Sequence, residues 1–347
     1  MRNSTLFIIV TTLVIISRGL YAQSAPTWVN NLEQAFPSRD WVAVLGQGAS
    51  QAQAEAAAMN ALARAFKTDV DSLTRTSQRY SQIINDSTGS KTVSFDESKN
   101  FSQEVNTSTN VQGLIGVQID VYRAPDRTVY VNARMNRREC AARYSGMIRE
   151  NAATIDKLLK SAAAITEQGT IEVYARLSFA CVIAQVTDNF QNILEILDPT
   201  AVNNKPPYGG ANAIKAKMLE CAALITIGIR VNTQQATDIN LFTRAAGSFF
   251  SDMDFKVNEQ GRGNYLLSVN VRFEELSQNV ISCRYYLDAA LKSQTGAAIF
   301  TFTEDDRKAH PNSATEARRL AVRAVETSFK EGKFVQQFNG WLNSFLD

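Results

Sequence analysis

The sequence predicts an α+β protein built from two small α/β sandwich domains, with helices on antiparallel or mixed sheets, joined by a long helical hairpin. Alternating apolar residues, which are typical of strands with one buried face, occur in two separate regions, at 111–135 and 267–302. Stretches with apolar residues at helical spacing accompany both regions. Between them, residues 139–164 and 171–197 carry a helical pattern that only Glu167-Gln168-Gly169 interrupts. Two sheet-forming regions separated by a helical one predict two units and a connector.

The first 22 residues have the composition of a signal peptide. Arg2 supplies a positive start, and Leu6 to Ile16 is an apolar segment too short to span a bilayer comfortably. Cleavage after Leu20-Tyr21-Ala22 would leave Gln23 as the new N-terminus. No later stretch is long and apolar enough for a membrane span. We therefore expect an exported mature chain that is periplasmic or secreted, with association with the outer membrane as a further option.

Residues 41–66 organise the first domain, which we place at residues 26–136. Every residue from Trp41 to Leu45 is apolar, so both faces of a strand here would be apolar. This predicts a strand buried on both faces. Gly46 and Gly48 follow and indicate a structural turn, which needs either positive φ or a close approach of the backbone. The Ala-rich segment after Ser50 then predicts a helix laid back on the strand, with Ser50 and Gln53 as a capping box.

The same glycines also suggest a dinucleotide-binding fingerprint, which we reject. Gln51 stands where the third glycine is required, and no second buried strand ending in an acid follows. We expect no cofactor.

A polar arm at 71–110 follows this helix and predicts a long exposed hairpin of two extended arms. The arm has few apolar residues, and its composition would also suit disorder. The next hairpin, at 111–135, is clearer because its two strands alternate strictly and should join the Trp41 strand in one sheet. Arg134, Arg137 and Arg138 end this hairpin. A solvated strand end explains them better than an anion contact, which remains the alternative.

The helical hairpin at 137–198 leads to a linker at 199–213, marked by Pro199, Pro206-Pro207 and Gly209-Gly210. The C-terminal α+β domain, at 214–347, should then contain a buried strand near 222–229, a helix at 239–250 and a three-stranded meander. A second capping box at Ser313–Glu316 and a last amphipathic helix close the chain.

The composition argues against several functions. The chain has 36 Lys and Arg against 34 Asp and Glu, and without Arg2 and Arg18 the two totals are equal, so nucleic acid is not an expected partner. The one histidine, His310, precedes Pro311 in a polar loop, which argues against His-based triads and metal sites. The four cysteines could form two disulfides, or they could all be buried free thiols. They are Cys140, Cys181, Cys221 and Cys283.

One acidic cluster, Glu304-Asp305-Asp306, could serve a carboxylate-based enzyme or a calcium-type oxygen site. It lacks the spacing of calcium ligands. We interpret it as a turn at a strand end, and we expect no enzymatic activity.

Several features of residues 26–136 occur in an order that resembles the LPP-twenty-type outer-membrane lipoprotein family, which includes the N-terminal domain of the flagellar H/T-ring protein FlgT. They are Pro26-x-Trp28, the strand with Gly-x-Gly, the Ala-rich helix, the polar arms and the hairpin ending Val129-Tyr130-Val131-Asn132-Ala133. The C-terminal part is more weakly similar to modules of FlgT, TolB and CsgG-like envelope proteins. Lipoprotein members carry an acylated Cys after the signal, and no Cys precedes Cys140 here.

The resemblance implies assembly of the envelope or a flagellar accessory role, not catalysis. We therefore expect an exported, non-enzymatic protein that contacts envelope or flagellar proteins, or further copies of itself through residues 71–110. A periplasmic ligand-binding module that uses a cleft between the domains, with Arg134, Arg137 and Arg138 as polar candidates, is the alternative.

Overall fold

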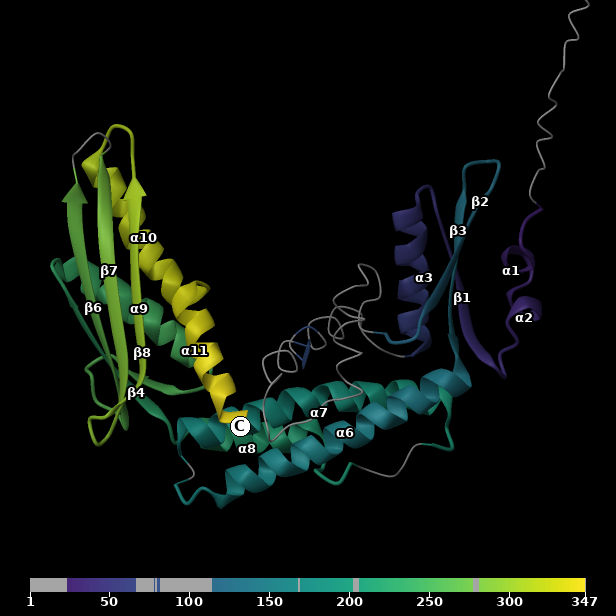
Figure 1. Ribbon diagram of the computed structural model, residues 1–347, viewed down its shortest axis with the longest axis horizontal. Helices are drawn as coiled ribbons and strands as arrows, with labels where there is room; N and C mark the ends of the chain where they lie inside the picture. Colours follow the sequence, from purple (N-terminus) through teal and green to yellow (C-terminus); the bar gives the residue numbers. More distant parts are fainter. Residues whose placement is uncertain are drawn as a thin grey trace, which may run out of the picture.

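Two sheet-containing units lie at opposite ends of a layer of helices (Figure 1). The computed structural model describes residues 24–66, 78, 80–81, 114–167, 169–201, 206–276 and 281–346. Sheets and helices occur together in both units, and the fold class is α+β, as expected. In the described part of the chain, no helix combines the length and the apolar character needed to cross a membrane.

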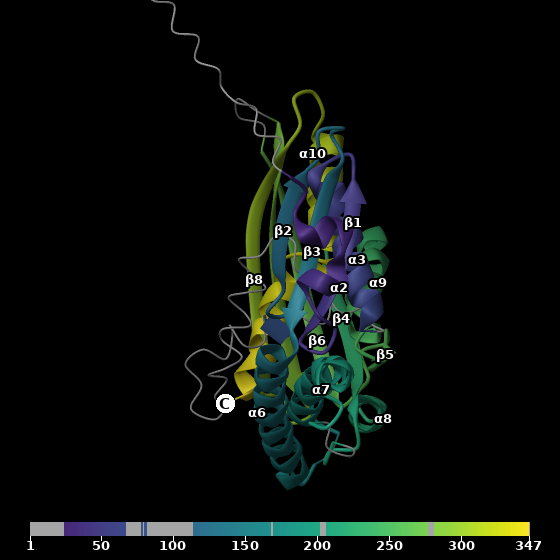
Figure 2. The same ribbon diagram turned by 90° about the vertical axis from the view of Figure 1, so that its right-hand side faces the viewer.

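The first unit contains a three-stranded antiparallel sheet in the order β1-β3-β2. Its strands are β1 (Trp41–Gly48), β2 (Gln118–Arg123) and β3 (Val129–Asn136). Helix α3 (Gln51–Ala65) packs on β1 and β3 and buries Ala54, Ala58 and Leu62 against them. Figure 2 shows the opposite face of the sheet, with α1 (Thr27–Asn30) and α2 (Leu32–Ala35) in front of it. The predicted hairpin and its sheet with the Trp41 strand are confirmed.

The prediction of a β1 buried on both faces is wrong. One face of β1 packs under α3, while Leu45 on the other face is 37% exposed. Gly46 and Gly48 also lie inside the strand, and the chain turns only at Ala49 and Ser50. Their role is the close approach: a Cβ on Gly46 would come 2.2 Å from the Ala54 carbonyl oxygen and 2.4 Å from the Ala58 nitrogen. The missing side chains let α3 lie directly on the strand.

We predict that Gly46→Ala destabilises the protein by about 1–3 kcal/mol, because helix and strand must separate to admit the methyl group. Gly340→Ala is the matched control. Gly340 is exposed on a helix with nothing within 4 Å of its added Cβ. The control should stabilise by about 0.5–1 kcal/mol through helix propensity. Urea unfolding of both variants measures this difference, and equal effects would disprove the close-approach explanation.

The expected single helix through Trp28 and Phe36 is instead two single turns. Asn31 adopts an extended conformation between α1 and α2, and its side-chain oxygen accepts a hydrogen bond from the Gln34 amide at 3.1 Å. An asparagine that caps a new helix in this way interrupts the preceding one. Trp28 remains buried, at 8% exposure.

Most of the predicted polar arm at 71–110 lies outside the described residues. Within it, Gln78, Tyr80 and Ser81 are helical, and Tyr80 and Ser81 are buried. The Tyr80 hydroxyl donates to the side-chain oxygen of Asn151. At this position the arm is therefore neither extended nor exposed, because a tyrosine that can bury its ring and satisfy its hydroxyl gains more from packing than from solvent.

Two long antiparallel helices form the layer between the units. They begin and end near the predicted residues: α6 spans Arg137–Ala164 and α7 spans Ile171–Leu197. The sequence did not predict α8 (Ala211–Ala222), which begins inside the expected linker and packs on α7. Asp188 of α7 fixes this helix, since its carboxylate accepts a hydrogen bond from the Ala211 amide at 2.9 Å. Burial raises the pKa of the Asp188 carboxyl above its usual value.

The C-terminal unit has a mixed five-stranded sheet in the order β5-β4-β6-β7-β8, with β4 parallel to both of its neighbours and the other pairs antiparallel. Phenylalanine rings from α9, β8 and α11 fill the core between sheet and helices. The elements are β4 (Thr226–Thr233), α9 (Ala236–Ser251), β5 (Lys256–Asn258), β6 (Tyr265–Leu276), β7 (Ser282–Ser293), β8 (Ala298–Ala309), α10 (Ala314–Lys330), α11 (Lys333–Asn343) and the 3-10 turn η1 (Ser344–Leu346).

All four cysteines are buried free thiols, one on each of α6, α7, α8 and β7. The free-thiol alternative therefore holds. Burial raises the pKa of the Cys221 thiol to about 11, so little reactive thiolate forms near neutral pH.

We predict four titratable thiols in unfolded, unreduced protein and almost no reaction of the native protein with a thiol reagent at pH 8. Both follow from the buried positions of the cysteines. Counting two thiols after unfolding without reductant would show a disulfide instead.

Candidate functional site

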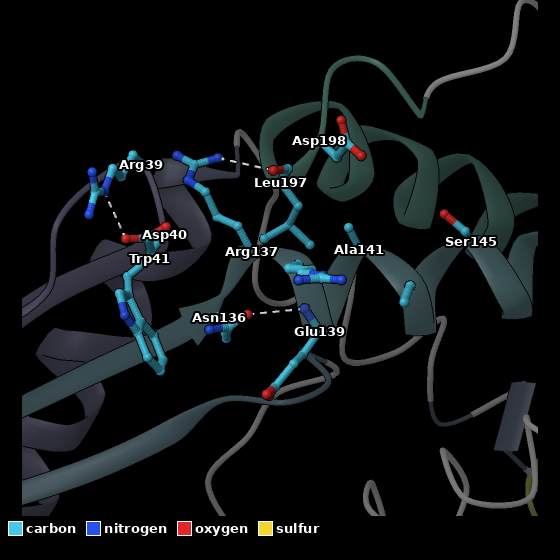
Figure 3. Close-up of a pocket in the computed structure, with 12 residues that line it drawn as sticks. Arg39, Asp40, Trp41, Asn136, Arg137, Glu139, Ala141, Ser145, Leu197 and Asp198 are labelled. Carbon is cyan, nitrogen blue, oxygen red and sulfur yellow. Dashed lines mark hydrogen bonds and ion pairs between the residues drawn. The ribbon is translucent and has the colours of Figure 1, made fainter.

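A hollow of about 760 Å³ lies where the first unit meets the helical layer (Figure 3). Three separate parts of the chain meet there: the segment leading into β1, the junction of β3 with α6, and the C-terminal end of α7. Six of the lining residues are charged, three of each sign, and the floor includes short apolar side chains. The lining residues are Arg39, Asp40, Trp41, Asn136, Arg137, Arg138, Glu139, Ala141, Ala142, Ser145, Leu197 and Asp198.

The hollow forms here because β3 continues into α6 without a loop. Asn136 ends the strand and caps the helix, with its side-chain oxygen accepting from the Glu139 amide at 3.0 Å. The Arg137 amide donates to the Asp40 carbonyl oxygen at 2.9 Å. These two bonds fix the first turn of α6 against the segment that precedes β1.

Arg137 joins three elements through its guanidinium group. Nε donates to the Ser38 carbonyl oxygen at 2.8 Å, while Nη1 donates to the last carbonyl groups of α7, those of Ile196 and, at 3.3 Å, Leu197. A cation at a helix C-terminus satisfies carbonyl groups that have no partner within the helix, and it complements the helix dipole. Arg137 is therefore a structural link between the first unit and α7, with few donors left for a ligand.

Arg134 does not reach this cluster. It forms an ion pair with Asp120 of β2, and its guanidinium lies over the Phe36 ring, 4.4 Å from the centroid, and near the Trp41 ring. Its side chain is only 15% exposed. This arginine packs the α1–α2 side of the sheet by charge pairing and cation–π contact.

Arg138 lines the hollow, as Arg137 does, and it is the exposed member of the predicted trio. It has no ion-pair or hydrogen-bond partner in the described part of the chain. The anion contact expected from Arg134, Arg137 and Arg138 is therefore not assembled as a group, because the first two are engaged elsewhere. The three arginines are close in sequence, but their side chains point in different directions. Side chains alternate between the two faces along β3, and they turn around the helix axis at the start of α6.

Acids balance the remaining cations. Arg39 pairs with Asp40 at 3.0 Å, and Glu139 and Asp198 line the same space. Hydrogen bonds from the Thr200 hydroxyl and amide lower the pKa of the Asp198 carboxyl, which stays ionised at neutral pH. The lining thus carries both signs side by side, a poor site for a single anion.

The acidic cluster is not a turn at a strand end. Glu304, Asp305 and Asp306 lie within β8, so Asp305 points to the opposite side of the sheet from its two neighbours. Glu304 is nearly buried and accepts from the hydroxyls of Tyr285 and Ser328, while Asp305 and Asp306 pair with Arg284 and Lys308. They do not converge on one point, and the described residues contain no metal-binding group of His, Cys, Asp and Glu.

Comparisons with known proteins give few matches. No protein-family model matches the chain, and no curated protein sequence matches it. A minor lipoprotein from Acinetobacter baumannii has 10% identity and a TM-score of 0.24, over 35% of this chain and 92% of that one. The secreted protein HP1454 from Helicobacter pylori has 11% identity and a TM-score of 0.34, over 84% of this chain and 99% of that one. Both scores are below 0.5 and carry no functional argument.

We predict that Arg137→Met lowers the free energy of unfolding by about 1–2 kcal/mol, because the terminal carbonyl groups of α7 lose a charged donor. The neighbouring Arg138→Met is the control and should change it by less than about 0.5 kcal/mol, since Arg138 is exposed and has no partner among the described residues. Thermal unfolding followed by circular dichroism compares them. A larger loss in the Arg138 variant would contradict the assigned roles.

Proposed function

We propose that this protein is exported and acts by binding other proteins of the cell envelope, without catalysing a reaction. Residues 1–22, with the composition of a signal peptide, support export. The role in envelope or flagellar-ring assembly that is implied by the family resemblance of residues 26–136 is the finer form of this proposal.

The mixed lining of the hollow is the observation that carries the proposal. Arg138 offers a cation that has no partner among the residues the structure describes, Asp40, Glu139 and Asp198 offer acceptors, and Ala141 and Ala142 add apolar lining. A polypeptide presents both charges and main-chain donors and acceptors, so it can satisfy such a surface. A small anion would meet as many acids as bases.

Crosslinking in living cells tests this proposal. We would replace Arg138 with a photo-crosslinking amino acid in the full chain, leader included, and irradiate cells. Arg244 is the matched control, since it is an exposed arginine on α9 in the other unit. We expect adducts of defined protein mass from position 138 and none from position 244. Equal crosslinking at the two positions would contradict a contact at the hollow.

A small-molecule ligand in the hollow is the second candidate. The volume of about 760 Å³ favours it, because ligand pockets commonly measure about 300–1,000 Å³. Native mass spectrometry of protein isolated without dialysis distinguishes the two. A bound small molecule that disappears in Arg138→Glu would support this candidate, and a protein adduct at position 138 would support the first.

A further inference from the structure

Strand β8 is a long free edge of the C-terminal sheet. It has 12 residues, and in the described part of the chain only β7 pairs with it. In Figure 2, β8 runs along the outer margin of its sheet. A register shift with β7 occurs at its beginning, beside Leu291 and Lys292, while the half from Phe302 to Ala309 is regularly paired. Along that regular half, the outward backbone groups form a template for another strand.

The sign of charge changes within this half. Three acids, residues 304–306, are followed directly by Arg307 and Lys308. Charges on an edge strand usually oppose pairing. An edge that carries first one sign and then the other opposes most registers but favours an antiparallel one, in which acids of one copy meet bases of the other.

We propose that two copies of this chain pair antiparallel through β8, with the two-fold axis at Asp306, to form one continuous ten-stranded sheet. This inference names a partner for the proposed protein-binding function and lies at a different surface from the hollow.

The alternation of side chains between the two faces of a strand selects this register. A two-fold axis perpendicular to the sheet keeps each face on its own side, so opposed residues must share a face. With the axis at Asp306, Asp305 lies opposite Arg307 of the partner subunit, and Arg307 opposite the partner's Asp305. Both residues are exposed on the face of the sheet away from the helical core. Residues 303–309 of each copy pair in this register.

Arg307 gains a carboxylate in this arrangement. In the single chain its Nε donates to the Ser282 hydroxyl, and it has no acidic partner among the described residues. The two Asp306 side chains meet at the axis, but each is already held by its own Lys308 at 2.6 Å. Moving the axis to Arg307 would instead oppose two guanidinium groups that lack an acidic partner among the described residues, and it would shorten the pairing to residues 305–309.

The other edges are less suited to a second copy. Strand β5 has three residues. Strand β1 is uncharged, but α3 packs directly on it, and a two-fold copy would bring a second α3 toward the first on the same face. In β2, Asp120 and Arg123 lie on opposite faces, so a symmetric pairing cannot join them.

Charge reversal with complementation tests the proposal. We expect the mature chain to dimerise in analytical ultracentrifugation and to dissociate as salt is raised. Asp305→Arg and Arg307→Asp should each weaken the dimer at least tenfold, because each opposes like charges twice. An equimolar mixture of the two variants should restore dimers, since arginine at 305 of one copy then faces aspartate at 307 of the other.

The mixture also controls for the local pair of Asp305 with Arg284. Every Asp305→Arg chain lacks that pair, whether its partner is a second Asp305→Arg chain or an Arg307→Asp chain. A monomeric parent at high protein concentration would overturn the proposal, and so would single variants that dimerise like the parent. If both variants weaken the dimer and their mixture does not recover, the assigned register is wrong. None of these results would alter crosslinking from position 138, which tests the proposed function separately.

Discussion

The burial of α7 is the constraint on which the rest of the structure depends. Most of its 27 residues are buried, on every side of the helix. A helix that is apolar all round must be enclosed by other elements. Here α6 and α8 pack along it, and α11 and η1 reach it from the C-terminal unit. Tyr174 stacks edge-on against Phe255 near one end, and Phe190 meets Tyr144 and Tyr80 further along. One buried helix thus connects the cores of both units.

Hydrogen bonds at the two ends of α7 fix how each unit is oriented against the helix, which apolar packing alone would leave adjustable. At its start, Thr170 caps the helix and the Ile171 amide donates to the Tyr265 hydroxyl of β6 at 3.3 Å. At its end, Arg137 of α6 takes the last carbonyl groups. Apolar burial is non-directional, whereas these hydrogen bonds are directional. They set how each unit meets the helix, and at the Arg137 end the same geometry leaves the hollow open.

Local patterns predicted the fold class and most elements. The alternation in β2, β3, β6 and β7 and the 3.6-residue periodicity of α6, α7 and α11 depend only on neighbours in sequence, so they could be read directly. Helix α8 was missed because Gly209 and Gly210 indicate a linker, and the helix begins immediately after them. The one-sided burial of β1 could not be read from the sequence, since Val44 and Leu45 are equally apolar and only the packing of α3 decides which face is covered.

The candidate site was predictable only in part. Arg138 was identified, yet its neighbours in the hollow come from residues near 40, 140 and 198, which no local pattern connects. Arg134 and Arg137 were grouped with it by sequence position, while their actual partners, Asp120 and the end of α7, depend on tertiary structure.

Among the described strands, the two longest at a sheet edge are β1 and β8, and they limit unwanted pairing with other strands in different ways. Strand β1 carries no charge that would repel another strand, and its protection is steric, because α3 lies on it through Gly46 and Gly48. Helix α10 also reaches β8, where the Ser328 hydroxyl donates to Glu304, but residues 303–309 include no glycine, and five of these seven side chains carry formal charge. A single sign would simply have kept other strands away. A change of sign at Asp306 and Arg307 does more, because it rejects partners that do not match in both direction and register. The charge order of β8 is therefore better explained by selective pairing than by protection alone.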